Sequence, residues 1–308
     1  FIYYILFLKK TLLKFNPDRL IVINGGYPGG LLCRSATICW GLYCGEKKTI
    51  HNFHNFAIPV NKFNVFENLI DKLVEKYSSV LISVSHCAAE SLRIRESFKI
   101  TKKIKFIYNG VVKKDNYIYV DMRGKLSIDK EYKVCLMLGT YEERKGHTFI
   151  LNAFEQVLIS NSNTVLIMAG YGSPLEIKKV VDYAKKIGVD KNVIFLDYVD
   201  EINNLFAISD VLLIGSQEFE SFGLTAVEAM LNYVPVVSTD TGGLKEVINN
   251  NEGGFVFNKK DHLAFAKKIV ELLNDDCMRL EQGIKGHNRV KNMFSASKMA
   301  EMYRNEIQ

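Results

Sequence analysis

The stretch VLLIGSQEFESFGLTAVE, residues 211–228, decides the fold. It opens on the apolar run Val211–Ile214, which has the length and composition of a buried β-strand. A polar loop follows, and a helix is expected to begin near Gly223 or Leu224. A strand that passes through a short loop into a helix is the building block of parallel sheets.

The same alternation of short apolar runs and helix-length amphipathic segments extends in both directions from this stretch. Helix starts are legible at Ser173-Pro174-Leu175-Glu176, a capping box with proline in the first turn, and at Asp261. The pattern predicts an α/β fold with parallel sheets covered on both faces. The predicted strands are Leu20–Asn24, Thr49–Phe53, Val80–Val84, Ile104–Tyr108, Lys133–Leu138, Val165–Ala169, Val193–Leu196, Val211–Ile214 and Val234–Ser238.

A length of 308 residues suits two domains. The segment Lys113–Glu131 is charged, contains Gly124 and has weak periodicity, so we place the linker there. We predict two Rossmann-like domains, residues 1–122 and 123–292, with a cleft between them. Ligand is expected outside the carboxyl ends of the strands. Residues 293–308 predict a last helix, which either returns to the first domain or stays with the second.

The net charge of +6 is unevenly distributed, because residues 1–122 hold 18 Lys and Arg against 9 Asp and Glu. A basic first half suggests an anionic partner. Its densest basic run, Arg93–Lys105, is interpreted either as a solvated helix face or as a patch for anionic membrane lipids. Nucleic acid is not expected, since no aromatic stacking module accompanies the basic residues.

The six cysteines form no C-x-x-C pair and no zinc-ligand spacing, which favours a reducing, cytoplasmic setting. The opening run Phe1–Leu8 is shorter than the ~20 apolar residues that span a bilayer. Because the chain does not begin with Met, we expect it to start within the protein, with the first domain incomplete. The sequence has no Asp-x-Asp pair and no G-x-S-x-G motif, so neither metal-dependent nor acyl-transfer chemistry is predicted.

Two loops that directly follow strands are candidates for binding an anion. In residues 139–146, Gly139 permits close backbone approach, and Arg144 and Lys145 can hold a diphosphate. In residues 218–228, the free N–H groups at the helix start form a phosphate seat. The alternative for the first loop is an ordinary exposed connection.

Two acids in the second loop can each accept hydrogen bonds from sugar hydroxyls, namely Glu220 before the helix and Glu228 one turn into it. The alternatives are a capping box between Thr225 and Glu228, and a solvated loop acid at Glu220. Two histidines, His51 and His54, flank the end of a strand, and one of them can face the cleft or both can be structural. The Gly170-Tyr171-Gly172 run lacks the third glycine of a dinucleotide site.

Taken together, these motifs resemble glycosyltransferase family 4, the retaining nucleotide-sugar transferases of GT-B fold. The resemblance covers most of the chain. It rests on Glu220–Leu224 continuing through Glu228-Ala229-Met230, Val234–Val237 and Gly242–Val247, and on Lys145-Gly146, Asn109-Gly110-Val111 and the strand end at His54.

The resemblance implies a role for each matching residue. Lys145 would hold the donor diphosphate, together with Gly139, Arg144, Ser221 and the backbone N–H groups of Phe222, Gly223 and Leu224. Glu220 would orient the donor sugar, Glu228 would bind the ribose and Val199 would lie near the base. His54 would approach the sugar, so that the implied catalytic residues are Glu220, His54 and Lys145. Neither a bound metal nor a cofactor is implied beyond the nucleotide-diphosphate sugar itself.

The sequence departs from the family in two places. Thr140 stands where the family often has Arg directly after the glycine. The chain also opens on a predicted helix that leads into Leu20–Asn24, where the family's first domain opens with a strand and a glycine-rich loop. The implied function is retaining transfer of a sugar to a glycan or lipid-linked acceptor in polysaccharide or cell-envelope assembly. The expected location is the cytoplasm, with peripheral contact at the inner face of an anionic membrane left open. The alternatives are a fragment that binds donor without transferring sugar, and an NAD-dependent oxidoreductase.

Overall fold

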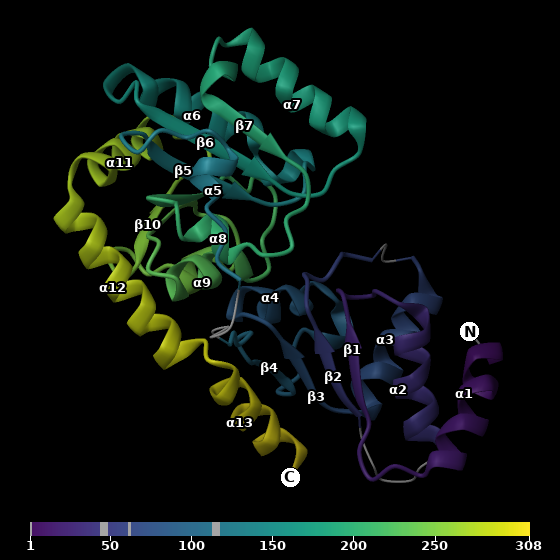
Figure 1. The fold of residues 1–308 in the computed structure, drawn as a ribbon. Helices are drawn as coiled ribbons and strands as arrows, with labels where there is room; N and C mark the ends of the chain where they lie inside the picture. The colour runs from purple at the N-terminus through teal and green to yellow at the C-terminus, as the bar shows by residue number, and fades with distance from the viewer. Residues whose placement is uncertain (1, 44–48, 61–62, 113–117) are drawn as a thin grey trace. The chain divides into compact units, whose positions relative to one another are not determined.

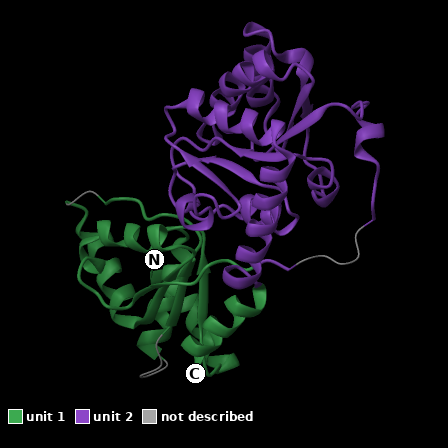
Figure 2. Ribbon diagram, turned by 90° about the vertical axis from the view of Figure 1, so that its left-hand side faces the viewer, with its two compact units in different colours: residues 1–110, 296–308 green, residues 111–295 purple. Residues whose placement is uncertain are grey.

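The computed structural model describes residues 2–43, 49–60, 63–112 and 118–308 (Figure 1). The chain divides into two compact units (Figure 2). The N-terminal unit contains residues 1–110 and 296–308, and the C-terminal unit contains residues 111–295. The predicted linker Lys113–Glu131 begins in a segment, 113–117, that lies outside the described residues. Its later part includes Met122 and Ile128, which are buried in the C-terminal unit.

The N-terminal unit is built on a parallel sheet of four strands in the order β1-β2-β3-β4. In its register Asn24 pairs with Phe53, Phe53 with Ser83, and Ser83 with Phe106, so the carboxyl ends of the strands are level. The strands are β1 (Ile21–Asn24), β2 (Thr49–Phe53), β3 (Ser78–Ser83) and β4 (Ile104–Phe106). Helices α1 (Ile2–Phe15), α2 (Leu31–Tyr43), α3 (Val65–Tyr77) and α4 (His86–Ser91) belong to this unit.

The last helix of the chain, α13 (Ala296–Ile307), belongs to the N-terminal unit. Its side chains Met299, Met302, Tyr303 and Ile307 pack against a buried cluster that includes Ile50, Val80 and Ile82. The hydroxyl of Tyr303 accepts a hydrogen bond of 2.5 Å from Asn52 Nδ2. The apolar stripe of α13 therefore covers the sheet of the first unit, although the preceding helix α12 (Asp276–Met293) belongs to the second.

The C-terminal unit contains a parallel sheet of six strands in the order β10-β9-β8-β5-β6-β7. From β5 the chain runs outward through β6 and β7, then returns to β8 and continues through β9 and β10 on the other side. The order therefore reverses between β5 and β8, which is the topological switch point of a doubly wound sheet. The strands are β5 (Lys133–Leu138), β6 (Thr164–Ala169), β7 (Val193–Leu196), β8 (Val211–Ile214), β9 (Val236–Thr239) and β10 (Gly254–Phe257).

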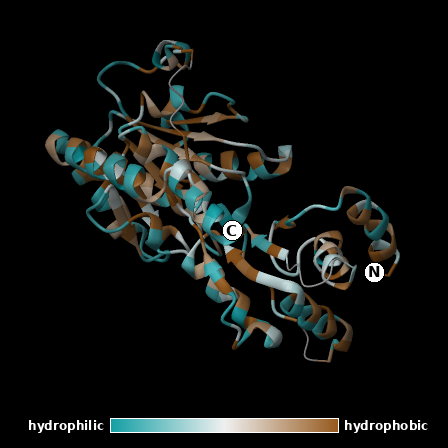
Figure 3. Cartoon of the chain, turned by 90° about the horizontal axis from the view of Figure 1, so that it is seen from below, coloured by the Kyte–Doolittle hydropathy of each residue, from teal (hydrophilic) through white to brown (hydrophobic). Residues whose placement is uncertain are grey.

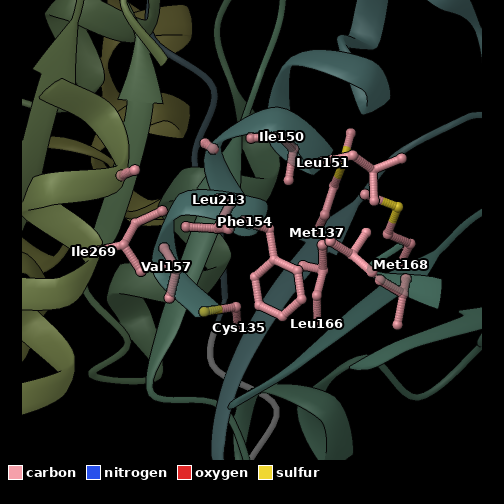
Figure 4. Close-up of a cluster of buried hydrophobic side chains, with 14 of the residues drawn as sticks. Cys135, Met137, Ile150, Leu151, Phe154, Val157, Leu166, Met168, Leu213 and Ile269 are labelled. Carbon is pink, nitrogen blue, oxygen red and sulfur yellow. The ribbon is translucent and has the colours of Figure 1, made fainter. Parts of the chain in front are cut away.

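The core of the C-terminal unit lies between this sheet and the helices α6 (His147–Ser160) and α11 (His262–Asn274). Residues Ile150, Leu151, Phe154 and Val157 recur at helical spacing on α6 and are fully buried (Figure 4). They meet Cys135, Met137, Leu166 and Leu213 from the strands (Figure 4). Figure 3 shows mainly hydrophobic strands and helices striped with hydrophobic and hydrophilic residues.

The predicted α/β fold with parallel sheets is confirmed. All nine predicted strands are present, with ends that coincide or shift by at most two residues, and β10 is an additional strand that the sequence did not predict. The capping box at Ser173 and Glu176 opens α7 (Pro174–Lys186), and Asp261 caps α11. Within the described residues, every helix is too short or too polar to cross a lipid bilayer.

Candidate active site

The loops that follow β5 and β8 meet at the switch point of the C-terminal unit. Gly146 has φ +74° at the end of the first loop, and a Cβ there would lie 1.9 Å from the carbonyl oxygen of Gly215. The amide of Gln217 donates a hydrogen bond of 2.8 Å to the carbonyl of Arg144. Only glycine fits the left-handed backbone and the close approach at position 146, so this residue allows the two loops to touch.

The contact of the two loops brings Lys145 and Glu220 together. Lys145 Nζ lies 2.7 Å from Glu220 Oε2, and Ser216 Oγ donates a weaker hydrogen bond of 3.3 Å to the same oxygen. The Lys145 and Glu220 side chains are only 21% and 17% exposed. Their attraction is therefore less screened by water than that of a surface pair. The Lys145 stem also runs past Gly139, whose Cβ position is 3.7 Å from it.

Helix α9 (Leu224–Leu231) begins directly after this loop, as the sequence predicted. Its N-cap is Gly223 with φ +103°, and no side chain caps it. Thr225 is the second residue of the helix, so the alternative capping box between Thr225 and Glu228 does not form. The first-turn N–H groups of α9 are thus not occupied by an N-cap side chain, as a phosphate seat requires. Glu228 is partly buried one turn further along.

The loop after β9 contacts the loop that carries Glu220 and holds its main chain. Gly243 N donates a hydrogen bond of 2.8 Å to Glu220 O, and a Cβ on Gly243 would lie 2.6 Å from the carbonyl oxygen of Ser221. The hydroxyls of Thr239 and Thr241 each donate a hydrogen bond of 2.7 Å to Ser216 O. These contacts fix the main chain on both sides of Glu220.

Two of the predicted donor-site residues, Phe222 and Val199, lie in different surroundings from Lys145 and Glu220. The ring of Phe222 is buried edge-on against Phe294 with 5.5 Å between centroids, so this residue can offer a ligand only its backbone. Val199 is partly buried in the loop after β7, three residues beyond the strand end. It therefore lies at the same edge of the sheet as Lys145 and Glu220, on the far side of β6 from them.

Arg144, next to Lys145, is paired with an acid of its own loop. Its Nε and Nη2 donate hydrogen bonds of 2.6 and 3.1 Å to the two carboxylate oxygens of Glu142. The hydroxyl of Thr140 donates a further bond of 2.7 Å to Glu142. The bonds from Arg144 and Thr140 hold the pKa of Glu142 below its usual value.

His54 lies in the N-terminal unit, whereas all other predicted site residues lie in the C-terminal unit. It follows β2 and is exposed, and its backbone amide donates a hydrogen bond of 3.0 Å to Asn24 O. Although the side chain is exposed overall, desolvation of the ring by neighbouring protein atoms lowers the pKa of His54, which favours the neutral ring at neutral pH. His51 is instead fully buried, 3.2 Å from Thr37 Oγ1 through Nδ1, and burial lowers its pKa to about 3. Of the two histidines, His54 is the one that can meet a ligand.

A glycine-rich loop beside His54 was not identified as a candidate from the sequence. It spans residues 24–30, read NGGYPGG, after β1. Asn24 Oδ1 accepts a hydrogen bond of 3.1 Å from Gly30 N, its Nδ2 donates to Pro28 O at 3.4 Å, and Gly29 has φ +54°. Four glycines directly after a strand are a signal for a binding loop that sequence reasoning could have used.

The basic run Arg93–Lys105 is largely neutralised within its own unit. It forms the ion pairs Arg93–Glu90 (3.0 Å), Arg95–Asp71 (2.8 Å), Lys99–Glu96 (3.9 Å), Lys103–Glu75 (3.1 Å) and Lys105–Glu306 (2.7 Å). Arg95 is buried with Asp71, so the run is not simply a solvated helix face, and the pairing of its charges gives no support to a contact with anionic membrane lipids. Within the described ranges, no group of three or more His, Cys, Asp and Glu residues could hold a metal ion.

Similarity to known proteins is extensive. N-acetyl-alpha-D-glucosaminyl L-malate synthase of Bacillus anthracis is 28% identical over 266 residues, which cover 84% of this chain and 67% of that protein. The capsular polysaccharide biosynthesis glycosyltransferase CapM of Staphylococcus aureus is 23% identical over 94% of this chain and 77% of its own. An uncharacterised glycosyltransferase of Methanocaldococcus jannaschii is 27% identical, and this chain spans only 57% of its length.

The fold has counterparts among solved structures. The crystal structure of the Anabaena protein HepE in complex with UDP superimposes with a TM-score of 0.82 at 17% identity, covering 98% of this chain and 81% of that one. This likeness confirms the predicted GT-B fold. A family model described as glycosyl transferases group 1 matches residues 120–289, more than half of the chain. The chain therefore belongs to the glycosyl transferases group 1 family.

Proposed function

We propose that the protein is a retaining glycosyltransferase that moves a sugar from a nucleotide-diphosphate sugar to a glycan or lipid-linked acceptor. The observation that carries this proposal is the Lys145–Glu220 pair at the switch point, on the loop that leads into the start of α9. A cation and a helix N-terminus suit the charge that develops on a diphosphate leaving group. Family membership supports the reaction class.

The proposed roles follow from charge and position. Lys145 and the first-turn N–H groups of α9 hold the diphosphate, so the charge of the leaving group is stabilised without a bound metal. Glu220 accepts hydrogen bonds from hydroxyls of the donor sugar, and Glu228 accepts them from the ribose. When a diphosphate binds, Lys145 exchanges part of its attraction to Glu220 for attraction to phosphate, which leaves the Glu220 carboxylate available to the sugar.

The proposed setting is polysaccharide or cell-envelope assembly. It is supported by the similarity to CapM, whose name places it in capsular polysaccharide biosynthesis. The complex of the HepE structure makes a uridine diphosphate sugar the first donor to try. The oxidoreductase alternative is set aside, since the chain belongs to a glycosyltransferase family.

The test begins with thermal unfolding in the presence of UDP-, GDP- and ADP-sugars, with NAD as the control ligand. A true donor at 100 times its Kd should stabilise the protein by about 2.7 kcal/mol, whereas NAD should have no effect. Release of the nucleoside diphosphate from the donor, with and without added acceptor, is then measured. Stabilisation without release would favour a chain that binds donor but does not transfer sugar. A protein that none of the nucleotide sugars stabilises would contradict the proposal.

A further inference from the structure

A cavity of about 340 Å³ lies between the start of α6 and the side of α7, two helices that pack against each other (Figure 1). This volume is in the range of small-molecule sites. Neither Lys145 nor Glu220 is among the residues that line the cavity. The proposed donor site therefore leaves this cavity without a role.

The cavity and helix α9 are on opposite faces of the C-terminal sheet. Residues of α6, α7 and α11 share one buried cluster with the strands. Helix α9 buries Ala226, Val227 and Met230, and none of these three belongs to that cluster, so α9 covers the other face. A ligand held between α6 and α7 would therefore occupy a different site from the donor.

One wall of the cavity contains a buried histidine that lacks a hydrogen-bond partner. His147 is 4% exposed, and its buried Nδ1 atom has no partner among the described residues. Its ring stacks on the ring of Tyr141, with 4.8 Å between centroids. The Tyr141 hydroxyl is already used, because it lies 3.0 Å from Met168 O and 3.3 Å from Leu196 O. The buried nitrogen of His147 requires a partner from outside the protein.

The His147 ring is uncharged at neutral pH. Burial lowers its pKa to about 4, with a smaller contribution from the charge of Lys145. A neutral imidazole presents one N–H donor and one acceptor nitrogen. A hydroxyl group, which both donates and accepts, is a suitable partner for either nitrogen.

Further polar side chains surround the opening of the cavity. Within the described ranges, the side chains of Glu143, Thr148 and Lys179 form no hydrogen bond or ion pair. Glu176 binds Ser173 N and Oγ through Oε2, at 2.8 and 2.6 Å, which leaves its other carboxylate oxygen for a ligand. Two acids and one lysine nearly cancel in charge, and all of these groups can bond to hydroxyls.

We propose that this cavity binds one uncharged sugar residue, at a site separate from the donor site. Val180 and the ring of Tyr141 supply an apolar wall for the C–H face of the sugar ring, while His147 and the polar side chains at the opening bond to its hydroxyls. The rival occupants are a small organic cation held by the two acids, and water alone. The inference does not depend on the donor chemistry, because the ligand is a free sugar and not a nucleotide.

The experiment follows the imidazole nitrogens of His147 by NMR in the whole chain labelled with 15N-histidine. The signals are assigned by their loss in His147→Phe, which keeps an aromatic ring beside Tyr141. Glucose, galactose, mannose and N-acetylglucosamine are each titrated to about 100 mM, well above a millimolar Kd. At least one sugar should shift the His147 signals to saturation, whereas glycerol and methylammonium should not. No shift with any of the four sugars, or a shift with methylammonium alone, would overturn the proposal.

Variants at exposed residues test the site without disturbing the core. Lys179→Ala should weaken binding of that sugar about threefold or more, and Thr148→Trp, which fills the cavity from its opening, tenfold or more. The matched control is Lys178→Ala, the same charge change at the neighbouring residue, which is 68% exposed, pairs with Asp182 at 2.6 Å and does not line the cavity. It should bind the sugar as the wild type does. Equal effects of the two lysine variants, or wild-type affinity in Thr148→Trp, would contradict the assignment.

A saturating nucleotide separates this site from the donor site. The nucleoside diphosphate that stabilises the wild-type protein should leave the sugar-induced shift of His147 in place. Displacement of the sugar by the nucleotide would mean that the sugar occupies the donor site, and only this inference would fail. If sugars shifted His147 but the protein bound no nucleotide, only the proposed function would fail.

Discussion

At the residue scale, the site depends on a few side chains whose surroundings differ. Glu220 is fixed by Lys145 and Ser216 and by backbone bonds on either side, whereas Glu228 lies within α9. The same residue type therefore serves two proposed purposes, orienting the sugar and holding the ribose. These purposes should be separable by kinetics, since a ground-state contact and a transition-state contact leave different signatures.

We predict that Glu220→Gln lowers kcat about 100-fold while the donor KM changes by less than threefold, because the neutral amide no longer pairs with Lys145 or orients the sugar. Glu228→Gln should instead raise the donor KM about tenfold with kcat retained, because it weakens a charged hydrogen bond present in both states. Steady-state rates of donor hydrolysis over a range of donor concentrations measure both. Full turnover by Glu220→Gln would show that its assigned role is wrong.

At the element scale, Gly146 determines how closely the loops after β5 and β8 approach each other. Gly146→Ala should destabilise the protein by more than about 2 kcal/mol, because the new Cβ meets the Gly215 carbonyl at 1.9 Å in addition to the strain at φ +74°. The control is Gly188→Ala. Gly188 has a similar φ of +78° but nothing within 4 Å of its Cβ position. It should therefore show only the backbone cost of about 1 kcal/mol.

Urea unfolding of the two glycine variants gives the comparison. The difference between them isolates the steric contact of the two loops from the conformational cost that they share. Equal destabilisation would mean that the loops can move apart freely, and the Lys145–Glu220 distance would then lose its structural basis.

The elements themselves were largely predictable. Apolar runs bounded by polar residues placed nine strands, and Ser173, Glu176 and Asp261 marked helix starts through contacts within four residues. The short strand Gly254–Phe257 was missed because its four apolar residues lie at the sheet edge beside β9, where only pairing with that neighbour identifies them as a strand. The capping box suggested for Thr225 and Glu228 failed because Gly223, two residues earlier, begins the helix with a left-handed backbone.

At the scale of the whole molecule, each unit buries a neutral histidine. Burial lowers the pKa of His51 to about 3 and that of His147 to about 4. In the unfolded chain both return to about 6.5, so below that pH the unfolded state binds protons that the folded state does not. Stability is therefore complete above about pH 6.5 and falls as the pH drops towards 4.

We predict that unfolding free energy decreases from pH 7 to pH 5 by about 2 kcal/mol for each histidine, as followed by urea unfolding with a probe in each unit. His51→Asn, which keeps a polar atom near Thr37, should flatten the pH dependence of the N-terminal unit alone. An unchanged slope in that variant would mean that other groups cause the acid sensitivity.

The sequence by itself determined the alternation of strands and helices, the parallel sheets and the motifs that resemble the family, because these depend on short-range periodicity, capping and backbone freedom. Only the tertiary structure decided which of those residues meet. Lys145 and Glu220 are 75 positions apart, and they form a pair because strand order places β8 beside β5. The same holds for His51 becoming buried while His54 stays exposed, and for the distant acids Asp71, Glu75 and Glu306 that pair with members of the basic run. Long-range packing sets burial and charge pairing, and no local pattern encodes it.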